Sequence, residues 1–150
     1  MMEAPSLRTI GLLFRSIHSS FRQEMERSLR KGGFGLTFAE VSILLALQLY
    51  PGSNGAQLAR RDMVSAQALT GVLRKLLAKK YIERQPHPES LRADSWHLSE
   101  KGRALMERAK PVYEAATSRM LSGLQSREIA DLEKYLRLCA RSLETTDAED

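Results

Sequence analysis

The chain has little cysteine: Cys139 is the single one among 150 residues. An internal disulfide is therefore excluded, and no paired cysteines are available to hold a metal ion. A protein of this kind is typical of a reducing compartment, so we expect a cytoplasmic location.

Long apolar runs are also missing. The longest uninterrupted run, Ile43–Leu47, is far shorter than the roughly 20 residues that cross a bilayer. The first residues lack the charged segment and apolar run of a signal peptide. We therefore expect no membrane-spanning segment.

The sequence patterns of common catalytic sites are missing as well. There is no HExxH, no glycine-rich phosphate loop and no nucleophile elbow. The three histidines, His18, His87 and His97, do not have the spacing of metal ligands. We expect no enzymatic activity, no metal and no cofactor.

Positive charge is in excess, and it is concentrated in the middle of the chain. The net charge is +5 and the pI is near 9.6. Residues 52–104 carry ten Lys/Arg and five Asp/Glu, whereas residues 1–51 have a net charge of +2 and residues 105–150 of −2. A surface that binds phosphates needs such a local excess. An ordinary solvated surface would give the same composition.

Two helices are predicted in the first third of the chain. Apolar residues recur every three or four positions over residues 6–31, as on one face of a long helix. Thr37 and Glu40 have the spacing of a capping box. The apolar segment after them predicts a buried central helix that Pro51 ends.

Two shorter helices separated by a tight turn are predicted next. The first covers about residues 55–61, and Ser65 is placed to cap the second, about residues 66–79. The inward stripe of the second helix is formed by Leu69, Val72, Leu73, Leu76 and Leu77. Its outward side is polar and basic, as a helix that enters the major groove of DNA requires.

A two-stranded hairpin is expected after these helices, over about residues 81–85 and 92–98. Pro86 and Pro88 should close the first strand, because proline cannot donate a ladder hydrogen bond. Trp96 should anchor the hairpin to the core. A helix-turn-helix followed by a hairpin is the outline of a winged helix-turn-helix, which binds double-stranded DNA.

Three amphipathic helices flank this module. One covers residues 6–31, one covers about residues 100–121 after a cap at Ser99, and one starts at a cap formed by Ser126. We expect Pro111 to kink or break the second of them. A domain of roughly 50 residues cannot easily cover three such apolar faces, so pairing with a second copy is expected.

The expected fold is therefore mainly α with a small β wing. Residues 36–99 are predicted to form the winged helix-turn-helix DNA-binding domain, and residues 1–35 and 100–150 the helices that build a homodimer. Cys139 falls on the apolar stripe of the last helix. We expect it to be a buried apolar residue rather than a redox switch.

The order and spacing of these segments resemble the MarR family of bacterial transcriptional regulators. The segments LTFAE and HLSEKGR match the family before and after the module. Within it, the family's positions are held by Leu58, Ala59, Ser65, Thr70 and Leu76. The resemblance implies a dimeric repressor, less often an activator, of a pseudo-palindromic operator. It also implies release from DNA by a small, often aromatic, effector.

The chain departs from the family pattern at three positions. Ser90 stands where the wing commonly has an Asp two residues before Arg92, and Gly71 stands where many members have an Arg. Lys80 replaces the Gly that commonly ends the second short helix. We expect a left-handed cap at Lys80 to be strained or absent.

The residues predicted to contact DNA are Ser65, Gln67, Thr70, Arg74, Lys75 and Arg92. Gln67 suits adenine, and Thr70 offers a hydroxyl and a methyl group to base edges. Ser65 and the helix start suit a phosphate, as do the two basic residues of the helix. Arg92 on the wing suits the minor groove.

The effector site is expected between the dimer helices and the DNA-binding module, as the resemblance implies. His18, Arg22 and Tyr113 are its candidate polar groups. Each also fits an ordinary surface or interface residue.

A winged-helix adaptor that binds proteins without reading DNA is the alternative. The departures at Ser90 and Gly71 keep this alternative open. DNA binding through several phosphates would weaken steeply as salt rises, whereas a dry apolar docking site would not.

Overall fold

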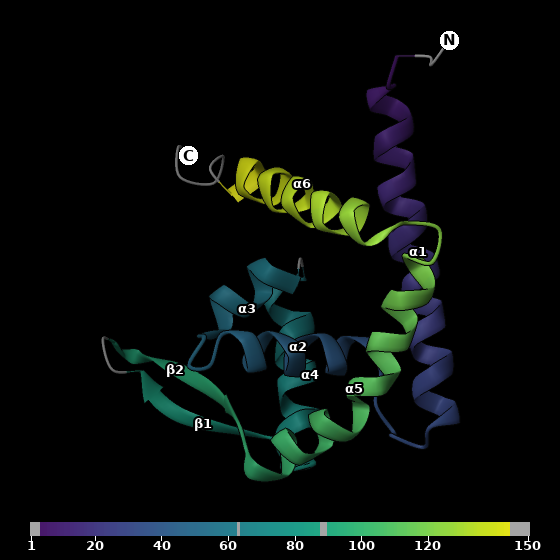
Figure 1. Ribbon diagram of the computed structural model, residues 1–150. Coiled ribbons are helices and arrows are strands. Elements are labelled where there is room, and N and C mark those ends of the chain that lie inside the picture. The colour runs from purple at the N-terminus through teal and green to yellow at the C-terminus, as the bar shows by residue number, and fades with distance from the viewer. Residues whose placement is uncertain (1–3, 63, 88–89, 145–150) are drawn as a thin grey trace. The chain divides into compact units, whose positions relative to one another are not determined.

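The computed structural model describes residues 4–62, 64–87 and 90–144. Within them six helices and two strands follow one another (Figure 1). They are α1 (Leu7–Lys31), α2 (Phe38–Leu49), α3 (Gly55–Asp62), α4 (Ala66–Ala78), β1 (Ile82–His87), β2 (Ser90–Leu98), α5 (Glu100–Met120) and α6 (Ser126–Glu144). The chain forms two compact units, Met1–Glu114 and Ala115–Asp150. None of the described helices is both long and apolar enough to span a membrane.

The first unit is built around α2. Figure 1 shows this helix at the centre of the unit, and it contacts α1, α3, α4 and β2. Its start is the predicted capping box: the Thr37 hydroxyl accepts from the Glu40 amide (3.2 Å), and the Glu40 carboxylate accepts from the Thr37 amide (3.0 Å). Val41, Ile43, Leu44 and Leu47 are buried, which confirms the central position of the helix.

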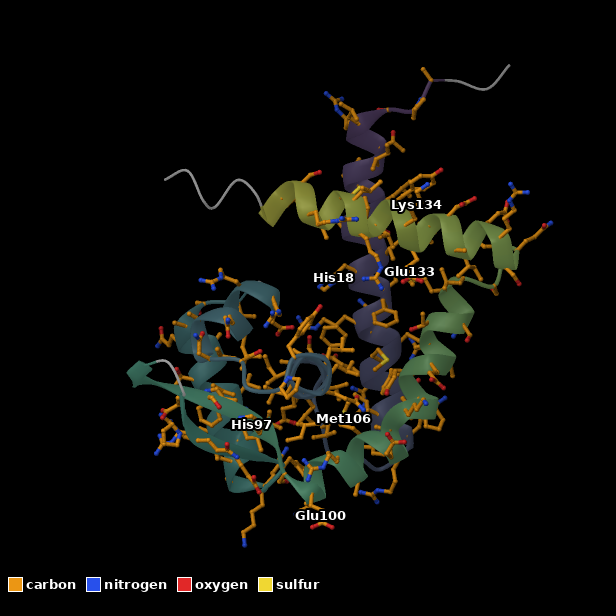
Figure 2. The ribbon with its side chains drawn as sticks, turned by 60° about the vertical axis from the view of Figure 1, so that its left-hand side comes forward. His18, His97, Glu100, Met106, Glu133 and Lys134 are labelled. Carbon is orange, nitrogen blue, oxygen red and sulfur yellow. The ribbon has the colours of Figure 1, made fainter. Side chains whose placement is uncertain are left out.

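The core of this unit draws apolar side chains from every element of the module. Besides those of α2, the core consists of Met25, Leu29, Leu36, Leu58, Leu69, Leu73, Leu76, Ile82, Trp96, Leu98, Leu105, Met106 and Ala109. Figure 2 shows Met106 among the side chains that fill the middle of the unit. Leu77 was predicted to point inward but is exposed, while Leu69, Leu73 and Leu76 form the buried stripe of α4.

The wing is a two-stranded antiparallel sheet in which Ile82 pairs with Leu98 and Arg84 with Trp96. The prediction that Pro86 closes the first strand was wrong, because Pro86 lies within β1 and pairs with Asp94. In a two-stranded sheet alternate backbone N–H groups point away from the partner strand, so a proline is tolerated. Pro88 lies outside the described residues.

Pro111 lies within α5, so the helix is not broken there, and a kink at this residue stays a prediction. The expected cap at Ser126 was wrong, because Ser126 is already the first helical residue and the side chain of Glu128 accepts from the Gln125 amide (2.7 Å).

Cys139 was predicted to be buried. In the single chain it is exposed, as are Leu136 and Leu143 on the same stripe of α6.

Candidate DNA-binding surface

The start of α4 is shaped by its N-cap. The Ser65 hydroxyl accepts from the Ala68 amide (3.1 Å), which fixes the first turn of the helix as predicted. The cap satisfies one first-turn amide, so the others remain oriented toward an incoming anion. Ser65 itself is exposed and lies beside this anion-attracting end.

The structure places the predicted α4 residues on one exposed side of the helix. Gln67, Thr70 and Arg74 recur at helical spacing opposite the buried stripe, and Lys75 flanks them; all four are exposed. Polar and basic side chains therefore gather on the face that the core leaves uncovered.

Thr70 has one restriction that the sequence did not reveal. Its hydroxyl donates to the carbonyl of Ala66 within the same helix (2.8 Å). The hydroxyl proton is thus used inside the helix. What Thr70 offers outward is a methyl group and an acceptor oxygen.

The basic residues of the module and of the start of α5 differ in whether their side chains are bound within the protein. Arg60, Arg74 and Lys75 are exposed, and within the part of the chain that the structure describes none of them has a hydrogen bond or ion pair. The contacts of Arg61, Lys79, Lys101 and Arg103 are internal. Arg61, for example, lies 3.9 Å from the centroid of the Tyr50 ring and donates to the Ser53 hydroxyl (3.0 Å). Only part of the excess charge is therefore available to a ligand.

The wing carries a cation that was not predicted from the sequence. Arg84 on β1 lies 3.7 Å from the Asp94 carboxylate on β2, and both side chains are largely exposed. No sequence signal gave the register that brings them together. Arg92 lies in β2, but its side chain is outside the described residues, as is that of His87.

The wing is also bound to the loop between α2 and α3. The Trp96 amide donates to the Ser53 carbonyl (3.0 Å), and the Gly52 amide donates to the Trp96 carbonyl (2.9 Å). Gly52 has a φ of +82°, which glycine adopts without steric cost. The Trp96 side chain is buried, so its predicted anchoring role is confirmed.

Two of the three candidate effector residues lie against one aromatic ring. The ring of His18, labelled in Figure 2, lies 6.1 Å from that of Phe38, and the Arg22 guanidinium is 5.8 Å from the centroid of the same ring. Phe21 also meets Phe38 edge-on (6.4 Å). Neither phenylalanine was predicted to belong to the effector site, because nothing in the sequence indicates that this part of α1 contacts the start of α2.

Tyr113, the third candidate, is half-buried on α5. Burial raises the pKa of its phenol above the usual 10.0, and the nearby carboxylates of Glu114 and Glu107 raise it further. The hydroxyl is therefore protonated at neutral pH. Among the described residues no group of His, Cys, Asp or Glu is arranged to hold a metal ion.

Together, α3, α4 and the β1–β2 hairpin form a winged helix-turn-helix, which places this protein in the class of DNA-binding proteins. Residues 34–93 match the sequence model of the MarR family. The HTH-type transcriptional repressor Rv2887 of Mycobacterium tuberculosis is 33% identical over 127 residues, which cover 85% of this chain and 90% of that protein.

Solved structures of the same mycobacterial protein are also similar. Its complex with salicylic acid aligns with a TM-score of 0.70 at 32% identity, covering 91% of this chain and 97% of that one. Its complex with DNA aligns with a TM-score of 0.69 at 31% identity, covering 91% and 98%. The chain belongs to the MarR family of winged helix-turn-helix transcriptional regulators.

Proposed function

We propose that this protein is a homodimeric repressor that binds a pseudo-palindromic operator and is released from it by a small aromatic acid. The exposed face of α4 carries the proposal, because it combines base-reading and phosphate-binding side chains on a helix fixed by the core. The DNA complex of the M. tuberculosis relative supports it. In the present protein, the residues proposed to contact DNA are Ser65, Gln67, Thr70, Arg74, Lys75 and Arg92.

The roles of these residues follow from their chemistry. Gln67 can form two hydrogen bonds with adenine, and the Thr70 methyl group can contact the methyl group of thymine. Ser65 and the first amides of α4 bind a phosphate, and Arg74 and Lys75 reach the phosphates beside it. Arg92, in β2 of the wing, has the side chain that suits the minor groove.

Dimerisation is inferred from apolar surface that a single chain leaves exposed. On α1 this surface consists of Leu7, Ile10, Leu12, Leu13, Phe14 and Ile17, and on α6 it includes Leu136, Leu138 and Leu143. Residues 1–35 and 100–150 would bury these faces against a second copy, while residues 36–99 read DNA. Two copies related by a two-fold axis place their reading helices in successive major grooves, roughly 34–36 Å apart.

The effector is inferred from the group around Phe38. The Phe38 ring offers an apolar face, and Arg22 offers a positive charge to a carboxylate, although it also pairs with Glu26 (3.3 Å). His18 supplies a further polar group beside the same ring, and Tyr113 on α5 is kept as a candidate from the sequence. The salicylic acid complex of the relative supports an aromatic acid as ligand.

The operator is best found by selecting genomic fragments with the purified protein. Bound fragments should share an imperfect palindrome, and their neighbouring genes identify the regulated functions. Affinity measured by fluorescence anisotropy should then fall linearly with salt on a log–log scale, because phosphate contacts release counterions. If no fragment were enriched at low salt, specific DNA binding would be refuted. A protein partner whose affinity does not change with salt would instead favour the alternative of a protein-binding adaptor.

Release is tested by adding salicylate to the operator complex. The affinity for the operator should fall, and this loss should be smaller in the Arg22→Ala variant. A ligand shifts affinity only by binding one conformation better than another. Equal affinities with and without salicylate would reject this effector class.

A further inference from the structure

The C-terminal end of α4 is tied to the start of α2 by one side chain. The ammonium group of Lys79, the residue after α4, donates to both carboxylate oxygens of Glu40 (3.0 and 3.1 Å) and to the carbonyl of Gly35 (3.1 Å). Glu40 is only 2% exposed. The same carboxylate accepts from the Thr37 amide, so it closes the capping box of α2 and holds the end of α4 at once.

The same end of α4 is tied to the start of α5. The Lys101 ammonium donates to the Lys79 carbonyl (3.0 Å), and the Ser99 hydroxyl donates to the Lys80 carbonyl (2.7 Å). The Ser99 amide donates to the Tyr81 carbonyl (3.0 Å). Three successive carbonyls that follow the helix are thus bound by residues at the beginning of α5.

These contacts connect the helix proposed to read DNA with both regions proposed to form the dimer. The loop containing Gly35 follows α1, Ser99 directly precedes α5, and Lys101 lies in the first turn of α5. Any shift of α1 or α5 relative to the module must therefore move the end of α4 or break these bonds.

Lys79 has no donor left for a phosphate in this arrangement. An ammonium group has three N–H donors, and three acceptors surround it here. Its side chain is 38% exposed, yet its charge is neutralised by Glu40. It differs in this from Lys75, one turn earlier, which has no such partner among the described residues.

We propose that Lys79 is a positioning residue. Together with Glu40 and Lys101 it fixes the placement of α4 against the dimer helices, and so it sets operator affinity without touching DNA. The proposal rests on the proposed function, since it assumes that α4 reads the operator.

The first test is Lys79→Met, which keeps most of the aliphatic stem and removes the ammonium group. Operator affinity should fall between about twofold and about thirtyfold, the range of coupling through packed networks. The slope of affinity against salt should stay at the wild-type value, because every phosphate contact is kept. Lys110→Met is the matched control, because Lys110 is an exposed lysine of α5 whose ion-pair partner among residues 4–62, 64–87 and 90–144 is the exposed Glu114 (3.8 Å). This variant should bind as the wild type does.

A double-mutant cycle tests the partnership with Glu40. In Glu40→Gln the amide oxygen can still accept from the Thr37 amide, so the cap is kept while the ion pair is removed. Lys79→Met and Glu40→Gln should each weaken binding, and the double variant should lose little more than the stronger single one. Circular dichroism and thermal unfolding establish that each variant is folded at the temperature of the binding measurement. If Lys79→Met does not fold, Glu40→Gln alone tests the proposal. It should show the same loss of operator affinity, and its slope of affinity against salt should stay at the wild-type value.

Three results would overturn the inference. The folded variants could bind the operator with wild-type affinity, or the slope of affinity against salt could fall together with the affinity. The losses of affinity in the two single variants could also add up in the double variant. Each is distinct from failure of the proposed function, because in that failure the wild type itself would bind no fragment.

Discussion

Two glycines of the DNA-binding module have opposite surroundings. A Cβ added at Gly102 would lie 2.0 Å from the carbonyl oxygen of Tyr81, whereas one added at Gly71 would meet nothing within 4 Å. Gly102 therefore permits the close approach of α5 to the end of α4. Gly71, one of the departures from the family pattern, has no such packing role.

Alanine at these two positions should change stability in opposite directions. Gly102→Ala should lower the free energy of unfolding by about 1–3 kcal/mol, because backbone must move. Gly71→Ala should raise it by about 0.5–1 kcal/mol, because alanine favours the helix and restricts the unfolded chain. Urea unfolding measures both, and equal effects would contradict the packing described for Gly102.

Lys80 occupies a conformation that glycine adopts more easily. Its φ is +62°, and the amides of Lys80 and Tyr81 donate to the carbonyls of Leu77 and Leu76 (2.9 and 3.0 Å). The left-handed cap is therefore present, formed by a residue with a Cβ. Lys80→Gly should raise the free energy of unfolding by about 1 kcal/mol, measured by thermal unfolding. Lys80→Ala, which keeps the Cβ, is the control and should bring no such gain.

At the scale of elements, the proposed DNA contacts come from α4 and from the wing. Arg74→Ala and Arg92→Ala should each weaken operator binding by about 1–3 kcal/mol. Because Arg74 is expected to bind a phosphate, its removal should also lower the salt slope by about one. Anisotropy titrations at several salt concentrations measure both quantities.

Arg61→Ala is the matched control for these variants. It removes a guanidinium that stacks on Tyr50 and donates to Ser53, so the loss should appear in thermal stability and leave the salt slope unchanged. If Arg61→Ala lowered the slope as Arg74→Ala does, the division of the basic residues into two groups would be wrong.

Most of the helices and strands could be predicted from the sequence, because the residue patterns that indicate them are local. The capping box at Thr37 and the cap at Ser65 depend on neighbouring residues alone, and both were confirmed. Pro86 was misjudged because its tolerance depends on which backbone side faces β2. Leu77 was misjudged because its exposure depends on packing between elements.

The candidate site was predictable to a smaller extent. Helical spacing was enough to place Gln67, Thr70 and Arg74 on one face. It did not reveal the bond from Thr70 to Ala66, the ion pair between Arg84 and Asp94, or Phe38 beside His18. These depend on rotamers, strand register and the meeting of distant segments, none of which a residue pattern encodes.

At the scale of the whole molecule, exposed apolar residues of α1 should hold two copies together. Ile17→Glu places a charge on this surface, where the native side chain is 48% exposed in the single chain. We expect this variant to sediment as a monomer and to bind the operator more than about tenfold less tightly, because only one half-site is then engaged at a time. Leu49→Glu, at an exposed apolar residue of α2, should remain dimeric. A dimeric Ile17→Glu protein would place the interface elsewhere.

Cys139 can test whether the apolar stripe of α6 is covered in the proposed dimer. The thiol is exposed in the single chain and shares a stripe of α6 with Leu136 and Leu143. If that stripe is covered in the dimer, a thiol reagent should react slowly with the wild type and quickly with the Ile17→Glu monomer. Equal rates would show that the stripe stays open in the dimer. Peroxide that released DNA from wild type but not from Cys139→Ser would assign the thiol a sensing role instead.

The backbone bridge between Trp96 and Ser53 limits how each protomer can adapt to a target. The hairpin is hydrogen-bonded to the loop before α3, and β1 also contacts α4, so we expect the hairpin and α4 to move together. In the proposed DNA complex, the bases contacted by the hairpin and those contacted by α4 would therefore keep a constant offset along the duplex. Adjustment to a different operator spacing would then require a change in the separation of the two modules of the proposed dimer, and this is the change that we expect a ligand bound beside Phe38 to control.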